Sequence, residues 1–113
     1  MASKTFGTVI AEYRKKLRLS QKELAEKLIK EDGEQISPQY LNDLEHDRRN
    51  PPADFLLKQF ARVLVIELDY LYTLAGEIPA DLRKQAARLD EERAKAAWLA
   101  FRKAADQDGK SRP

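Results

Sequence analysis

The sequence predicts an all-α fold, with five helices between residues 5 and 76 and one or two further helices after them. Apolar residues recur at intervals of three and four, which is the spacing of one helix face. Two helix-start signals follow one another, Ser20-Gln21-Lys22-Glu23 and Ser37-Pro38. No alternation of apolar and polar residues persists long enough to indicate a β-strand.

The first two helices are predicted from an apolar stripe and a capping box. The first stripe recurs at spacings of four, three and four residues: Phe6, Ile10, Tyr13 and Leu17. The second helix starts at Ser20, whose hydroxyl can accept from the Glu23 backbone N–H while the Glu23 carboxylate accepts from the Ser20 N–H. Leu24, Ala25 and Leu28 give this helix its inner face.

The third helix is short and polar on one side. Ser37 is a favourable N-cap, and Pro38 stands at the first helical position, where no backbone donor is lost. Leu41 and Leu44 face inward, with Ile36 just ahead of them. The polar side consists of Gln39, Asn42, Asp43 and His46. The cations of Arg48-Arg49-Asn50 follow, before Pro51-Pro52 stops the helix.

The remaining helices divide the chain into two parts. A fourth helix, started at Pro52, uses Phe55 or Leu56, then Phe60, Ala61 and Leu64, and a fifth uses Leu68, Leu71, Leu74 and Ala75 before Gly76 ends it. We therefore expect a first domain over 1–76. A helical segment follows over 77–105, as one helix or as two if Asp90 caps a separate last helix. The polar tail 106–113 is expected to be disordered.

Composition excludes several classes of function and leaves DNA binding undecided. The chain has one His, no Cys and no Gly-rich phosphate loop, so we expect no enzyme activity, no cofactor and no metal site. No run of eighteen apolar residues and no secretory signal appears, which makes a cytoplasmic protein the expectation. The net charge of +2 is weak support for a nucleic-acid partner.

The ordered set of residues resembles the Cro/C1-type helix-turn-helix family, also called XRE-like regulators. The matching positions are Phe6, Ile10, Arg14, Leu19-Ser20-Gln21, Glu23-Leu24-Ala25, Ile36-Ser37, Tyr40-Leu41, Leu44-Glu45, Arg48-Arg49-Asn50-Pro51, Leu64, Leu71 and Ala75-Gly76. The resemblance covers about two-thirds of the chain. It implies a lambda-repressor-like five-helix bundle whose third helix, residues 37–46, enters the major groove of DNA.

Two positions depart from the family pattern. The family joins its second and third helices by a tight turn containing Gly, whereas Ile29–Gln35 is several residues longer here. Either the second helix is extended or the turn bulges. Asp47 stands where the family favours Gly, and Asp adopts a left-handed backbone at some cost.

The resemblance also implies which side chains contact DNA. The base-facing positions are Ser37, Pro38, Gln39 and Asp43, where Gln39 can read adenine and Asp43 can accept from cytosine. The backbone-facing positions are Gln21, Tyr40, Asn42, Arg48, Arg49 and Asn50. Arg14 and Glu45 match a family pair that bridges the first and third helices. Tyr40 could equally be a packing residue.

Family members usually bind near-palindromic sites in double-stranded DNA as two-fold dimers. The dimer interface is expected in the C-terminal helices, on Leu82, Leu89, Trp98 and Phe101, unless this segment folds back on its own bundle. The sequence is therefore interpreted as a homodimeric repressor that binds DNA, which would associate it with the nucleoid in the cytoplasm. The alternatives are an antitoxin, which would hold a partner protein through the C-terminal helices, and a helical protein-interaction module without DNA binding.

Overall fold

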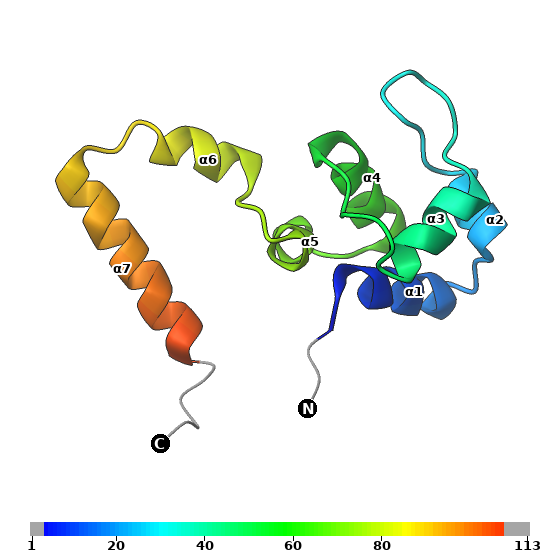
Figure 1. Cartoon of the computed structure of the whole chain (residues 1–113), viewed down its shortest axis with the longest axis horizontal. Coiled ribbons are helices and arrows are strands. Elements are labelled where there is room, and N and C mark those ends of the chain that lie inside the picture. Colours follow the sequence, from blue (N-terminus) through cyan, green and yellow to red (C-terminus); the bar gives the residue numbers. More distant parts are fainter. Residues whose placement is uncertain (1–3, 108–113) are drawn as a thin grey trace. The chain divides into compact units, whose positions relative to one another are not determined.

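A computed structural model describes residues 4–107 of the chain. Within this range the chain forms seven helices and no β-strand (Figure 1). The helices are α1 (Phe6–Lys16), α2 (Gln21–Ala25), α3 (Pro38–Glu45), α4 (Asp54–Leu64), α5 (Leu68–Ala75), α6 (Ala80–Ala86) and α7 (Glu91–Gln107). The predicted all-α fold is confirmed. The chain divides into two compact units, Met1–Pro79 and Ala80–Pro113.

In the first unit, helices α1 to α5 pack around one hydrophobic core. Helix α1 lies against α3, α4 and α5, while α2 packs on α3 and α4 packs on α5. Phe6 meets Phe60 edge to face, with ring centroids 6.1 Å apart. One expectation is corrected, because Leu17, at the end of the first stripe, is exposed. Of the two alternatives at the start of the fourth stripe, Leu56 faces the core and Phe55 is exposed.

The segment between α2 and α3 bulges, and α2 is not extended. Helix α2 ends at Ala25, although Leu28 beyond it is fully buried. Ile29 and Gln35 then form an isolated antiparallel bridge, and the Ile36 N–H donates to the Leu28 carbonyl at 3.1 Å. The chain between them projects from the bundle as a loop (Figure 1).

A buried glutamine from α4 fixes the base of this loop. The Gln59 side chain accepts from the Ile29 N–H at 2.9 Å and donates to the Ile29 carbonyl at 2.8 Å. It thereby satisfies both backbone groups of Ile29, as a neighbouring β-strand would. Because α4 holds the loop, the extra residues do not loosen the entry to α3.

Helix α4 differs from its predicted boundaries at both ends. Pro52 lies before the helix, because Ala53 is extended and takes the N-cap position. The helix stops at Val65, whose φ of 59° is left-handed. A β-branched residue is a genuine outlier in that region, and the Val65 side chain is 76% exposed. The left-handed turn brings the next residue, Ile66, into the core.

The described part of the second unit, residues 80–107, forms two helices rather than one. Asp90 begins α7, because its carboxylate accepts from the Arg93 N–H at 2.8 Å. Helix α7 runs to Gln107, so Asp106 and Gln107 are helical and the predicted disorder from 106 is wrong for these two residues. The rest of the expected tail, 108–113, lies outside the described residues.

Candidate nucleic-acid interface

The beginning of α3 presents a short polar surface. Ser37 caps the helix by accepting from the Tyr40 N–H at 3.0 Å, and Pro38 occupies its first turn. Leu41, Leu44 and Glu45 are buried on the inner side. Three of the predicted base-facing residues, Ser37, Pro38 and Gln39, are exposed, and the fourth, Asp43, is half-buried.

A buried ion pair joins α3 to α1. Arg14 Nε lies 2.6 Å from Glu45 Oε2, and Arg14 Nη2 lies 3.0 Å from Glu45 Oε1, so the contact is bidentate. Arg14 also donates to the Leu19 carbonyl at 2.8 Å. The Arg14 and Glu45 side chains are only 11% and 3% exposed. Glu45 therefore acts inside the bundle and adds little negative charge to the surface.

Gln21 extends this network from α2 into α3. Its Nε2 donates to Glu45 Oε1 at 2.9 Å and to Asn42 Oδ1 at 3.0 Å. Both amide hydrogens are used within the protein, which leaves only a carbonyl oxygen that a phosphate repels. In this arrangement the side chain of Gln21 does not offer the phosphate contact that the sequence suggested. The Asn42 amide, held by Gln21, keeps its own two donors for a ligand.

The capping box before α2 also forms. Ser20 Oγ accepts from the Glu23 N–H at 3.0 Å, and the Glu23 carboxylate accepts from the Ser20 N–H at 2.8 Å. The hydrogen bond from the Ser20 backbone lowers the pKa of the Glu23 carboxyl below its ordinary value. The start of α2, and with it Gln21, is therefore fixed at neutral pH.

Asp43 gathers three of the other predicted DNA-contacting side chains. Its Oδ1 accepts from Gln39 Nε2 at 3.0 Å and from Arg48 Nε at 3.3 Å. Its Oδ2 lies 3.9 Å from Arg49 Nε. The sequence assigned Asp43 a base contact of its own, but in the structure its carboxylate is already engaged by these neighbours. Asp43 is therefore placed to orient Gln39 and both arginines.

Tyr40 is both a packing residue and a support for Arg49. Its ring packs against the hydrophobic core, and the Arg49 guanidinium lies over it, 4.7 Å from the ring centroid. Burial raises the pKa of the Tyr40 hydroxyl, and the positive charge of Arg49 lowers it in part. The tyrosine therefore stays protonated at neutral pH and can donate to an acceptor.

The turn after α3 is closed by a contact that sequence reasoning missed. Asp47 has a left-handed backbone, with φ of 58°. Its carboxylate accepts from the Thr5 hydroxyl at 2.6 Å and from the Gly7 N–H at 3.0 Å. A Gly at this position could make neither contact. Asp47 thus fastens the start of the basic turn to the beginning of α1, and Arg48, Arg49 and Asn50 follow it exposed.

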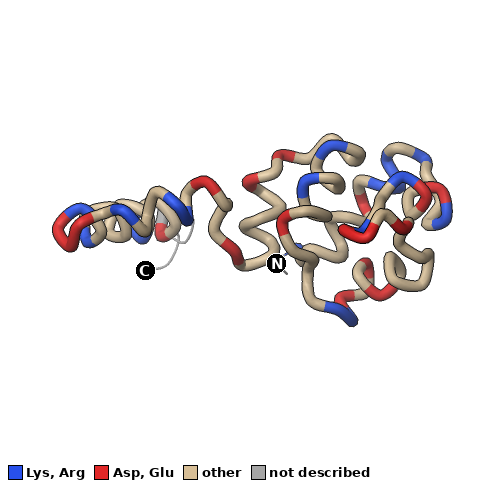
Figure 2. Tube along the Cα trace, turned by 90° about the horizontal axis from the view of Figure 1, so that it is seen from above, with Lys and Arg blue, Asp and Glu red and all other residues tan. Residues whose placement is uncertain are grey.

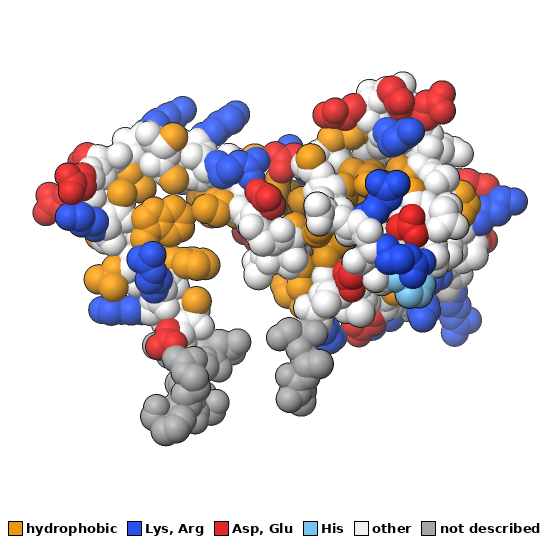
Figure 3. Space-filling model, viewed as in Figure 1, with side chains coloured by type: hydrophobic (Ala, Val, Ile, Leu, Met, Phe, Trp, Pro, Cys, Tyr) orange, Lys and Arg blue, Asp and Glu red, His pale blue; other side chains and the backbone are white. Residues whose placement is uncertain are grey.

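The surface around α3 carries basic and acidic side chains close together and has no continuous basic stripe. Lys and Arg alternate with Asp and Glu along both units (Figure 2). In the space-filling view, basic side chains surround an acidic one over α3 and the turn that follows it (Figure 3). Positive potential at the interface therefore depends on Arg48 and Arg49 and not on net charge.

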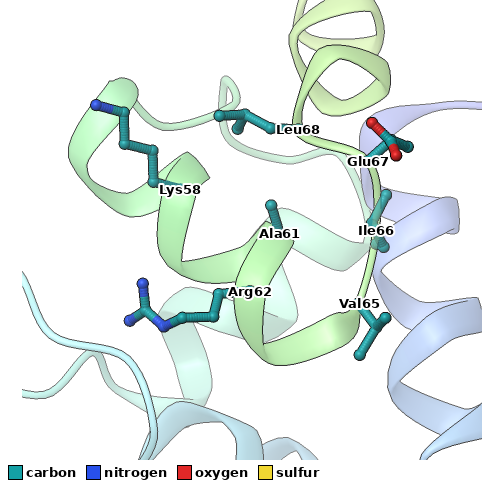
Figure 4. Close-up of a pocket in the computed structure, with 7 residues that line it drawn as sticks. All are labelled: Lys58, Ala61, Arg62, Val65, Ile66, Glu67 and Leu68. Carbon is teal, nitrogen blue, oxygen red and sulfur yellow. The ribbon is translucent and has the colours of Figure 1, made fainter.

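Residues 4–107 contain no ligand pocket, metal site or membrane span that is as well formed as the polar surface around α3. A shallow pocket at the turn between α4 and α5 is lined by Lys58, Ala61, Arg62, Val65, Ile66, Glu67 and Leu68 (Figure 4). Among residues 4–107, no group of three or more His, Asp or Glu side chains could hold a metal ion. No helix in this range is long and apolar enough to cross a membrane.

The residues predicted for a dimer interface lie on α6, α7 and the connection between them. Leu82, Trp98 and Phe101 are exposed, together with Leu99, while Leu89 is half-buried. Trp98 and Phe101 pack edge to face, with ring centroids 6.2 Å apart. This aromatic pair is exposed together with Leu82 and Leu99, so the second unit presents apolar side chains to solvent.

One comparison with known proteins identifies a family. Residues 10–71, more than half of the chain, match a family model described as helix-turn-helix. The match begins in α1 and ends in α5, and it includes the whole of the polar surface around α3. No curated protein and no solved structure matches the chain significantly.

Proposed function

The chain belongs to the Cro/C1-type helix-turn-helix family, and we propose that it is a sequence-specific transcriptional regulator, a homodimeric repressor that inserts residues 37–46 into the major groove. One observation carries the proposal: a buried network through Arg14, Glu45 and Gln21 holds α3 rigidly and leaves its polar face exposed. Rigid support is what a base-reading helix needs, because its side chains must meet base edges within a few tenths of an ångström.

Base reading is assigned to the first turns of α3. Gln39 can pair with adenine through its amide N–H and carbonyl oxygen, and the hydrogen bond to Asp43 sets the orientation of that amide. Ser37 offers a hydroxyl, and Pro38 offers an apolar contact, for example to a thymine methyl. Asp43 can accept from cytosine N4 only through lone pairs that Gln39 and the arginines leave free.

Backbone contacts are assigned to the residues that flank α3. Arg48 and Arg49 lie beyond its end, and Asn42, Asn50 and the Tyr40 hydroxyl supply neutral donors. These contacts fix the position of the protein on the duplex without reading its sequence. Gln21 acts in this set by holding Asn42 through their 3.0 Å hydrogen bond.

Salt dependence tests the assignment of Arg48 and Arg49. Changing both to Ala should weaken binding to preferred and random DNA alike. The log–log slope of affinity against salt should flatten by roughly one unit for each lost phosphate contact. Lys84→Ala together with Lys103→Ala removes the same charge from exposed positions on α6 and α7 and serves as the matched control. An unchanged slope in the Arg48/Arg49 variant would contradict the proposal.

The division of labour between the two units completes the proposed function. Residues 1–76 would bind DNA, and residues 77–105 would hold the dimer through Leu82, Leu89, Trp98 and Phe101. Exposed aromatics of this size on a separate helical unit support a partner surface. The repressor assignment follows the family resemblance.

A further inference from the structure

Helix α7 carries its aromatic residues on one face with small residues around them. Ala94, Trp98, Phe101 and Ala105 follow one another at spacings of four, three and four, so they share one side of the helix. Ala97 and Ala104 lie beside this row. Trp98 is 37% exposed and Phe101 63% exposed, and they already contact each other edge to face. The face is therefore preformed and apolar.

We propose that this face of α7 pairs with α7 of a second copy of the chain, antiparallel, about a two-fold axis between Ala97 and Trp98. The proposal rests on the homodimer proposed above and specifies how its two chains meet. Two complementarities select the antiparallel arrangement, one of side-chain size and one of charge.

Size complementarity follows from the position of the axis. In the antiparallel pair, Phe101 of one copy lies opposite Ala94 of the other, and the two Trp98 rings meet beside the axis. Each Phe101 ring thus meets a methyl group, and facing large and small residues allow two helices to interdigitate. In a parallel pair, Phe101 would meet Phe101, and Ala94 would face Ala94 across a gap.

Charge complementarity selects the same direction. Glu91 and Arg102 are eleven residues apart, close to three helical turns, so both flank the aromatic row on the same side. An antiparallel partner brings its Arg102 near Glu91, and the two-fold axis repeats the contact. A parallel partner would place its own Glu91 and Arg102 on the opposite side of the interface, so neither contact would form. Lys95 holds Glu91 at this flank by an exposed contact of 3.2 Å within the helix.

Single cysteines distinguish the two directions, because the chain itself contains none. A disulfide requires Cα atoms within about 7 Å. In the antiparallel pair, Ala97→Cys lies next to its own copy and should cross-link on mild oxidation of the full-length protein. Ala94→Cys is about 10 Å along the axis from its own copy and should not cross-link alone. It should do so when mixed with Phe101→Cys. Efficient self-cross-linking of Ala94→Cys would overturn the antiparallel arrangement.

Charge reversal provides an independent test in protein without new cysteines. Glu91→Arg should weaken self-association about three- to tenfold, since two attractive contacts become repulsive. Arg102→Glu should do the same, and the double variant should restore self-association. Glu92→Arg is the matched control, because Glu92 stands in the same helical turn but points away from the aromatic row. Equal effects of the Glu91 and Glu92 changes would reject the charge contact.

Failure of this proposal is distinguishable from failure of the proposed function. Sedimentation measures self-association, and operator binding is measured separately on the same samples. A dimer whose cysteine pattern is parallel overturns only the arrangement of α7. A full-length chain that binds DNA but remains monomeric at tens of micromolar overturns the α7 pairing. Absence of DNA binding by an intact dimer contradicts the regulator and leaves the pairing standing.

Discussion

The N–H of Gly7 donates to the carboxylate of Asp47 at 3.0 Å, across 40 residues of sequence. This hydrogen bond joins the first turn of α1 to the turn that follows α3. The approach is so close that a Cβ on Gly7 would lie 2.3 Å from the Leu44 carbonyl oxygen and 2.6 Å from that of Glu45. The end of α3 is therefore seated directly on the backbone of α1.

Gly7→Ala should destabilise the protein, against the usual sign. Ala in a helix interior is ordinarily favoured over Gly by about 1 kcal/mol. Here the added methyl would collide with backbone oxygens that cannot rotate away, and overpacking of this kind costs about 1–3 kcal/mol. Chemical denaturation measures the free energy of unfolding. A variant more stable than the parent protein would show that α1 and α3 can separate freely.

Asp47→Gly should also destabilise the protein, although Gly suits the left-handed backbone better. The substitution relieves a modest conformational cost but removes two hydrogen bonds, each with a net value of about 0.5–1.5 kcal/mol. We expect a net loss of about 1 kcal/mol in the free energy of unfolding. Asp47→Asn is the control, because Asn tolerates the same backbone and keeps one acceptor. A stabilised Gly variant would mean that the contacts to Thr5 and Gly7 contribute nothing.

Arg14 and Glu45 should show strong coupling in a double-mutant cycle. Removing either partner leaves a buried charge unpaired, which typically costs about 3–5 kcal/mol. Arg14→Met combined with Glu45→Leu should cost much less than the sum of the single changes. Thermal and denaturant unfolding of the four proteins gives the coupling energy. Strict additivity would show that the 2.6 Å contact carries no stability of its own.

Gln39 and Asp43 should both support sequence discrimination, but their substitutions should change binding affinity in opposite directions. Gln39→Ala should cost about 1–3 kcal/mol on the preferred site and relax discrimination at one base pair per half-site. Asp43→Asn removes a negative charge beside DNA and releases Arg48 and Arg49, so binding to random DNA should tighten while the specificity ratio falls. Titration of preferred and random duplexes at one salt concentration measures both. Weaker binding of Asp43→Asn to random DNA would contradict the orienting role.

Much of the fold could be predicted from local sequence because helix starts and apolar spacing are local signals. Ser20 and Ser37 mark two starts correctly, and Gly76 marks the end of α5. What could not be predicted depends on contacts between distant residues. Gln59 fixes the loop at Ile29, and Asp47 binds Thr5 and Gly7. Each of these contacts joins residues far apart in the chain, and no sequence motif marks such pairs. The same limit explains the extended Ala53 and the left-handed Val65 at the ends of α4.

In the candidate site, too, some features could be predicted from the sequence and others could not. The identity of the polar residues on α3 follows from the sequence and from the family resemblance. Their mutual arrangement does not, because Gln21 and Asp43 could each have faced solvent or a neighbour. The structure turns both toward protein partners. Hydrogen bonds between side chains depend on a helix-packing angle that composition and periodicity leave open.

Removal of the second unit should separate folding from dimer formation. A chain ending at Pro79 retains the whole buried core, whose residues all lie between Phe6 and Tyr72. Its free energy of unfolding should therefore stay within about 0.5 kcal/mol of the value for the first unit in the full-length chain. Circular dichroism during denaturation measures this stability, and sedimentation should find a monomer.

The truncated chain should bind operator DNA much more weakly than the full-length protein. Two recognition helices of a two-fold dimer must sit about 34 Å apart to enter successive major grooves on one side of the duplex. With that link removed, the second half-site no longer binds as an intramolecular event, and avidity of about a hundredfold or more is lost. Binding to an isolated half-site should be unchanged, which makes it the internal control. A truncated form that still dimerises would place the interface within the first unit.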